Sequence, residues 1–293
     1  MTIPSLARFR TAAATVAAAT VILALTACTS TPPDAPRSAA SGAASGLPDA
    51  HVHGLSVDGD TGQVLLATHD GLFDVSSIPA EKIGPSHDLM GYTKASDPGV
   101  FYASGHPEAG SDLPSPLGLI KTTDGGRTWQ QLSRQNESDF HALAATKSGI
   151  VAYDGTLRTS TDGIAWRTVG ADFSPFALAG NPNSDTVLAT TEEGIQRSTD
   201  GGSTWTAGTT APVIQFAAFA NTGEAVGVAP GGTVYYSPDE GVSWQQRGTP
   251  TGQVHAVAVA TAADGTLQVW AATSAGLVRS TDGGTTFRPA HAG

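Results

Sequence analysis

The chain has 293 residues, a length that fits one large domain or two small ones. It carries 26 acidic against 15 basic side chains, and the resulting formal net charge of −11 argues against nucleic acid or anionic lipid as its main partner. The single cysteine, Cys28, excludes an intramolecular disulfide.

The first 28 residues have the features of a secretory signal peptide. Arg8 and Arg10 precede an Ala-rich apolar run over 11–27, and no acidic residue occurs before Cys28. The run ends in Leu-Thr-Ala-Cys, which resembles the bacterial lipobox, where the cysteine sulfur is acylated and the cysteine becomes the new N-terminus. An uncleaved anchor is the alternative, because the run is a marginal membrane span. We predict a lipoprotein signal peptide over 1–28, with Cys28 anchoring the protein by lipid to the extracytoplasmic side of the cell membrane.

The next segment, residues 29–49, is rich in Ser, Ala, Pro and Gly and shows no apolar periodicity. Such a composition is typical of a flexible linker. We predict that this linker joins the lipidated end of the protein to a folded domain over 50–293.

Beyond the linker, the chain repeats itself. Four octets share the pattern Ser/Thr-x-Asp-x-Gly-x-Ser/Thr-aromatic, and they occupy 122–129, 198–205, 237–244 and 280–287. A fifth copy, over 160–166, is one residue short, and the aspartates of successive copies lie 38 to 43 residues apart. Asp and Ser/Thr side chains can hydrogen-bond to neighbouring backbone, and Gly permits a tight turn. We therefore interpret the octets as structural elements that stabilise turns between strands. They resemble the Asp-box (BNR) repeat of bacterial sialidases and related propellers.

Three short apolar strands precede each octet. In one unit they cover 140–145, 149–153 and 155–158, and the segment 51–80 has the same shape without an octet. Counting that segment gives six units of four short strands, and no segment after residue 50 has the period of a helix. The sequence therefore predicts an all-β protein, a six-bladed β-propeller with Asp-box repeats.

Histidines gather on one face of this predicted propeller. The octets lie between the third and fourth strands of each unit, so they share a face with the turns between the first and second strands. Most of the histidines map to the opposite face, together with Asp70, Asp88 and Asp139. In ring order, the inner strands begin with His53, Met90, His141, Phe176, Phe216 and His255. We predict a ligand-binding site on this face, formed by His51, His53, His69, Met90, His106, His141 and His255.

Some of these histidines are candidate metal ligands, namely His53, His69, His106 and His141. Imidazole suits copper and zinc, and the nearby Met90 favours copper. The alternative is that each histidine caps its own strand by bonding to nearby loop backbone. The longest loop, 106–117, lies on the same face, and long loops on a rigid scaffold usually carry function or cover a site.

Five short stretches resemble a bacterial family of propeller lipoproteins that is classified as sialidase-like glycosyl hydrolases: 51–55, 68–72, 88–91, 104–107 and 139–143. This resemblance implies glycoside hydrolysis, with Asp70, Asp88 and Asp139 as candidate carboxylates. Sialidases, however, hold their substrate carboxylate with three arginines. Here most arginines lie within or beside the octets, and Arg134 alone falls in a loop on the histidine face, with Arg247 near its edge. The residues therefore do not support exo-sialidase chemistry, whereas another glycosidase needs only two carboxylates about 5 to 9.5 Å apart.

Three functions follow from these observations. The first is a membrane-anchored extracytoplasmic lipoprotein that binds a small ligand or a metal ion, copper or zinc, on its His-rich face. The second is a sialidase-like glycoside hydrolase that acts on a glycan. The third is a protein-assembly factor, because some Asp-box propellers resemble photosystem assembly proteins.

Overall fold

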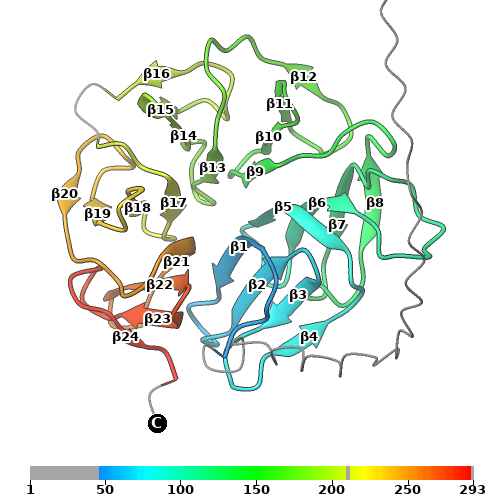
Figure 1. The fold of residues 1–293 in the computed structure, drawn as a ribbon. Coiled ribbons are helices and arrows are strands. Elements are labelled where there is room, and N and C mark those ends of the chain that lie inside the picture. The colour runs from blue at the N-terminus through cyan, green and yellow to red at the C-terminus, as the bar shows by residue number, and fades with distance from the viewer. Residues whose placement is uncertain (1–45, 209–211, 292–293) are drawn as a thin grey trace, which may run out of the picture. The chain divides into compact units, whose positions relative to one another are not determined.

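A computed structural model of the chain, shown in Figure 1, describes residues 46–208 and 212–291. They form six antiparallel four-stranded sheets around a central axis, so the fold is the six-bladed β-propeller that the repeats predict. The signal peptide predicted over 1–28 and most of the linker, 29–45, lie outside the described residues. Within the described ranges, no helix is long and apolar enough to cross a membrane.

The first three blades follow one another along the chain. Blade one contains β1 (Val52–Val57), β2 (Val64–Thr68), β3 (Gly71–Asp74) and β4 (Glu81–Ile83). Blade two contains β5 (Asp88–Lys94), β6 (Phe101–His106), β7 (Leu119–Thr122) and β8 (Gln130–Ser133). Blade three contains β9 (Ala142–Ala145), β10 (Ile150–Tyr153), β11 (Leu157–Ser160) and β12 (Arg167–Thr168). Blade one is thus complete although it lacks an octet.

The last three blades repeat this order. Blade four contains β13 (Ala177–Gly180), β14 (Val187–Thr191), β15 (Gly194–Ser198) and β16 (Thr206–Ala207). Blade five contains β17 (Phe216–Phe219), β18 (Ala225–Val228), β19 (Val234–Ser237) and β20 (Gln245–Gln246). Blade six contains β21 (Val254–Thr261), β22 (Leu267–Thr273), β23 (Gly276–Ser280) and β24 (Arg288–Pro289).

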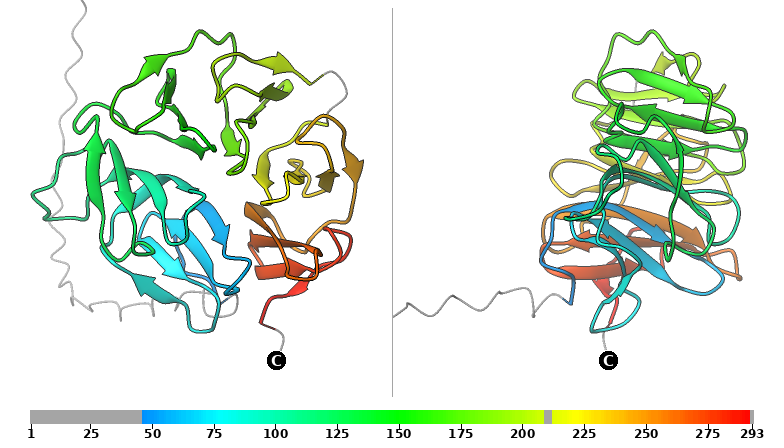
Figure 2. Two further views of the ribbon diagram at one scale, coloured as in Figure 1. Left: turned by 180° about the vertical axis from the view of Figure 1, so that it is seen from behind. Right: turned by 90° about the vertical axis from the view of Figure 1, so that its right-hand side faces the viewer.

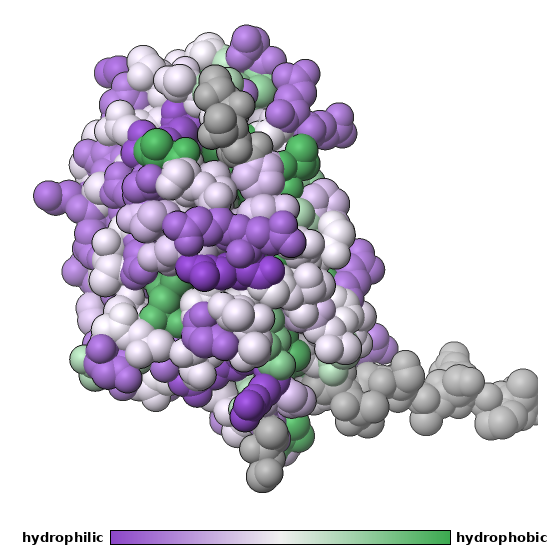
Figure 3. All heavy atoms as spheres, turned by 90° about the vertical axis from the view of Figure 1, so that its left-hand side faces the viewer, coloured by the Kyte–Doolittle hydropathy of each residue, from purple (hydrophilic) through white to green (hydrophobic). Residues whose placement is uncertain are grey.

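The first strand of each blade lies nearest the axis, as Figures 1 and 2 show. The ring closes where β1 packs beside β21. Each sheet consists of four consecutive strands, so no sheet combines strands from the two ends of the propeller. Side-chain packing between blades one and six closes the ring instead. Val57 and Leu66 of blade one share a buried cluster with Trp270 and Leu277 of blade six. The outermost strands β16, β20 and β24 are exposed, and Figure 3 views this side of the ring, where hydrophilic and nearly neutral residues predominate over smaller apolar patches.

The octets form the turns between the third and fourth strands, as predicted, and the octet 198–205 shows how they hold. The Ser198 hydroxyl donates to Asp200 Oδ1 over 2.8 Å and accepts the N–H of Gly202 over 2.9 Å. Asp200 in turn accepts the N–H and the hydroxyl of Thr204 over 2.8 and 2.6 Å. Trp205 then packs into a cluster that includes Val151 of the preceding blade. Each octet thus closes its own turn and fastens its blade to the neighbouring one.

The octet aspartates make the fold sensitive to acid. A hydrogen bond from the Thr128 hydroxyl is the main reason that the pKa of Asp124 falls from 3.8 to about 2. A hydrogen bond from the Thr286 N–H has the same effect on the pKa of Asp282, also about 2. Between the unfolded pKa of 3.8 and the folded pKa of about 2, the unfolded chain binds more protons than the folded protein. The stability that these carboxylates add is therefore full above pH ~4 and is lost as the pH falls toward 2.

We expect the melting temperature to fall steeply between pH 4 and pH 2, and calorimetry across that range measures it. The fall should be shallower in the Asp124→Asn, Asp282→Asn double variant, which no longer carries the two carboxyls. An equal slope in both proteins would show that other groups cause the acid sensitivity.

Candidate functional site

A cavity of about 570 Å³ opens on the axis at the face opposite the octets. All six residues that the sequence pattern places at the start of the inner strands line it: His53, Met90, His141, Phe176, Phe216 and His255. His51, Gln215 and Gln253 also line it. The cavity is therefore formed by all six blades, with one equivalent position from each.

Backbone bulges present several of these side chains to the cavity. The pairing of β1 with β2 shifts by one residue between Val52 and Gly54, so His53 is the extra residue of a bulge. His255 occupies the same place in β21, and a similar shift in β5 contains Met90. A bulge turns a side chain away from the regular alternation of its strand, and it is common next to binding sites.

Three histidines of blade one form a cluster, and two of them, His51 and His53, line the cavity. One ring nitrogen of each of His51, His53 and His69 lies within 4.8 Å of the other two. His51 Nδ1 and His53 Nε2 are 3.3 Å apart, with one ring donating a hydrogen bond to the other. The His53 ring centroid lies 4.7 Å from that of His51 and 4.6 Å from that of His69, which makes His53 the centre of the trio.

Asp88, from the adjacent blade, holds one ring of this trio by a hydrogen bond and lies near a second. His69 Nδ1 donates to Asp88 Oδ2 over 2.8 Å, which leaves Nε2 of His69 free for another partner. Asp88 Oδ1 is buried, accepts no hydrogen bond from the described residues and lies 4.0 Å from His53 Nε2. Burial, followed by repulsion from His69, His51 and His141, lowers the pKa of His53 to about 4. His53 is consequently neutral at pH 7, and its approach to Asp88 is not an ion pair.

His106 and His141 belong to a second group, centred on Asp139. The Nε2 atoms of His106 and His141 lie 3.3 and 2.8 Å from the same oxygen, Asp139 Oδ2. His106 Nδ1 is 3.3 Å from the Ser115 hydroxyl in the loop between β6 and β7. The structure therefore brings together His51, His53 and His69, and it places the predicted ligands His106 and His141 around a different carboxylate.

The other predicted residues have separate places. Met90 and His255 line the cavity, whereas Asp70 is exposed and its N–H donates to the hydroxyl of Thr68. Neither Asp88 nor Asp139 is among the described residues that line the cavity. His87 is buried, and its Nδ1 accepts the N–H of Glu108 over 3.1 Å, so it anchors the long loop. Burial lowers the pKa of His87, in keeping with a neutral ring that accepts this hydrogen bond.

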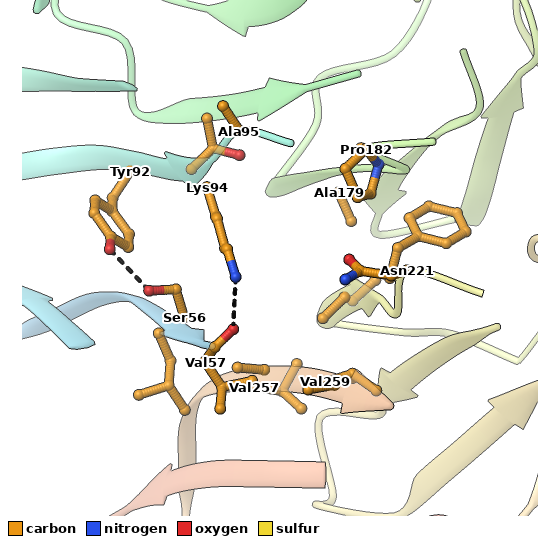
Figure 4. Close-up of a pocket in the computed structure, with 18 of the residues that line it drawn as sticks. Ser56, Val57, Tyr92, Lys94, Ala95, Ala179, Pro182, Asn221, Val257 and Val259 are labelled. Atoms are coloured by element: carbon orange, nitrogen blue, oxygen red, sulfur yellow. Dashed lines mark hydrogen bonds between the residues drawn. The ribbon is translucent and has the colours of Figure 1, made fainter. Parts of the chain in front are cut away.

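A smaller cavity of about 160 Å³ lies at the other end of the axis and is shown in Figure 4. There the hydroxyls of Ser56 and Tyr92 are joined over 2.8 Å, and Lys94 Nζ donates to the carbonyl of Val57 over 3.1 Å. Tyr92, Leu143 and Leu178 line both cavities, so they form the partition between them. Burial raises the pKa of Tyr92, which keeps its hydroxyl protonated.

Solved structures of other propellers share the fold of this chain. A GH74 enzyme of Niastella koreensis matches 82% of the chain at 21% identity and a TM-score of 0.56, and the chain spans only 37% of that enzyme. Virginiamycin B lyase of Staphylococcus aureus matches 84% of the chain and 86% of its own length at 17% identity and a TM-score of 0.52. YCF48 bound to a D1 peptide matches 67% of the chain and 79% of its own length at 18% identity, with a TM-score of only 0.41, which is too low to support a structural comparison.

These likenesses extend to the fold alone, because every identity is below 25%. No family model matches the chain, and no curated protein matches its sequence. What the chain does must accordingly be argued from its own residues.

Proposed function

We propose that this chain is a lipid-anchored, extracytoplasmic propeller that binds a transition-metal ion, Zn²⁺ or Cu²⁺, at His51, His53 and His69. The observation that carries the proposal is the convergence of three imidazole nitrogens within 4.8 Å of one another.

The spacing of the trio suits a metal ion. Zn–N bonds of about 2.0–2.1 Å in a tetrahedral site put neighbouring nitrogens roughly 3.3–3.4 Å apart. His51 Nδ1 and His53 Nε2 are 3.3 Å apart, and His69 can offer Nε2. Copper accepts the same imidazole ligands, and Met90 lines the same cavity.

The arrangement around His69 also matches metal sites in other proteins. A ligating histidine almost always donates its second ring N–H to a carboxylate, a carbonyl or a water, which fixes the ring and makes its free nitrogen more basic. The hydrogen bond from His69 Nδ1 to Asp88 supplies this orientation, and the carboxylate adds negative charge beside the histidine trio.

Metal analysis of protein without a polyhistidine tag tests the proposal. After incubation with Zn²⁺ or Cu²⁺ alone and removal of excess ion, we expect one ion per chain. At a free ion concentration of 100 times Kd, binding stabilises the fold by about 2.7 kcal/mol, which raises the melting temperature by roughly 5–10 °C. Substoichiometric metal together with an unchanged melting temperature would refute the proposal.

Asp88→Asn tests the role of the carboxylate. The amide is the same size but has no negative charge, so His69 loses its charged partner. We expect a 10- to 100-fold weaker affinity for Zn²⁺, the usual cost of losing such a partner. Competition with a chromogenic chelator measures this affinity. Asp139→Asn is the matched control, since Asp139 holds His106 and His141 in the same way, and its affinity should stay near that of the unchanged protein.

The anchoring part of the proposal is supported by Arg8, Arg10, the apolar run and Leu-Thr-Ala-Cys before the linker. Acyl chains on Cys28 would hold the protein at the membrane with ~0.8 kcal/mol per buried CH₂ group. Detergent phase partitioning of cells that express the full chain tests this part. The unchanged protein should enter the detergent phase, and Cys28→Ser should not; equal partitioning of both would exclude lipidation at this position.

The glycosidase and assembly-factor alternatives have less support. The GH74 likeness concerns the fold only. The candidate carboxylates Asp88 and Asp139 are engaged by histidines, and neither is among the described residues that line the cavity. A panel of aryl glycosides tests the first alternative, and pull-down from solubilised membranes tests the second.

A further inference from the structure

The wall of the axial cavity is chemically divided. Blades six, one, two and three contribute the polar arc, in which His255, His53, Met90 and His141 follow one another around the ring. Blades four and five contribute an aromatic arc, formed by Phe176 and Phe216 with Pro175 beside them. The two rings are T-shaped, with their centroids 5.7 Å apart.

The aromatic arc offers apolar surface to an incoming molecule. Phe176 is 58% exposed although it lines a cavity, so much of its ring has no partner among the described residues. Phe216 is partly buried against the core of blades five and six, and its ring contacts that of Phe176. Exposed aromatic surface that lines a concave site is typical of ligand-binding pockets.

The polar arc offers a coordination position. Three protein ligands leave a tetrahedral ion with one open position, and zinc sites of this kind can expand to five-coordinate, so a head group can bind through one or two oxygens. His51 and His53 both line the cavity, so the free position of the proposed ion can be reached from it. The cavity of about 570 Å³ also falls within the range of about 300–1,000 Å³ that small-molecule sites occupy.

The remaining lining residues of the cavity also indicate what kind of ligand fits it. Tyr92, Leu143 and Leu178 form a base whose one hydroxyl already bonds to Ser56, so this surface is largely apolar toward the cavity. Gln215 and Gln253 add neutral donors and acceptors to the lining.

We infer that the axial cavity takes an aryl-bearing small molecule whose oxygen-rich head group, a carboxylate or hydroxamate, binds the ion on His51, His53 and His69. The aromatic body of the molecule lies against Phe176 and Phe216. This inference rests on the proposed metal site and adds the chemical class of its ligand.

Two probes with the same head group test the inference. Benzohydroxamate and acetohydroxamate both chelate zinc, and one carries a phenyl group where the other carries a methyl group. Calorimetric titration of the zinc-loaded protein measures both affinities. Filling an apolar pocket with the ring should favour benzohydroxamate by at least ~10-fold. Zinc content, measured before and after each titration, shows that the probe does not strip the ion.

Phe176→Ala should reduce this preference to within a few-fold while the zinc content stays unchanged. Val242→Ala is the matched control, because Val242 is 59% exposed and lies in the octet over 237–244 on the other face. It should keep the full preference. Equal affinities for the two probes, or a preference that survives Phe176→Ala, would overturn the inference and leave the metal site standing. A protein that takes up no zinc would overturn both.

Discussion

His53→Ala is expected to abolish stoichiometric metal binding. His53 is the central ring of the trio, and without it the rings of His51 and His69 remain, with centroids 5.3 Å apart. Loss of a direct ligand should weaken the affinity for Zn²⁺ by more than the ~10- to 100-fold that loss of an orienting partner costs. Metal content after gel filtration and the melting shift on adding Zn²⁺ both measure the effect.

His255→Ala is the matched control for this prediction. His255 occupies the equivalent position in blade six, is also the extra residue of a bulge and lines the same cavity, but it is not part of the trio. We expect it to keep one ion per chain and the full melting shift. If both variants lose the ion equally, the cavity binds metal through a diffuse set of histidines, and the assignment to blade one is wrong.

The fold could be predicted from the sequence because each blade repeats the same local interactions. The hydrogen bond between Ser198 and Asp200 joins residues only two apart in the sequence. The octet pattern therefore already contains the groups that form its turn. Blade one shows the same principle without the octet, because its strand pattern alone was enough to identify it. Predicted strand ends differ by a few residues; the strand expected to start at 140 begins with Ala142.

The sequence could predict which residues of the site meet at the axis, but not which of them contact one another. Equivalent residues of equivalent strands must meet at the axis, which is why His53, Met90, His141 and His255 were found together. Which histidines cluster depends on contacts between neighbouring blades. His106 is the last residue of β6 and His69 directly follows β2, and each meets an aspartate of the next blade. The loop that carries Ser115 then holds His106, and the sequence contains no signal for that contact.

The bulges were equally hidden from the sequence. His51 and His53 are two residues apart and would point the same way from a regular strand. The bulge at His53 changes that alternation, yet the ring of His51, which lies just before β1, still meets the ring of His53. The sequence identifies Phe176 and Phe216 as ring positions but contains no signal that they line a site.

Gly202→Ala is expected to destabilise the fold by about 2–5 kcal/mol, the sum of a left-handed backbone and an overpacked core. Gly202 has φ of +82°, and an added Cβ would lie 2.8 Å from Cγ2 of Val151 in the preceding blade. Gly201, its neighbour in the same octet, has φ of +66° with open space around the same position. Gly201→Ala is therefore the matched control and should cost only about 1–2 kcal/mol, for the backbone alone.

Chemical denaturation of the two metal-free variants separates backbone strain from packing between blades. A clear excess in Gly202→Ala means that the octet glycine is required where one blade meets the next. The same contact recurs at Gly241, where an added Cβ would lie 2.6 Å from Leu188 of blade four, and at Gly284, 2.9 Å from Val234 of blade five. Equal losses in the two variants would instead confine the role of this glycine to its own turn. The octet would then stabilise single blades, and packing between blades would rest on the aromatic that ends it.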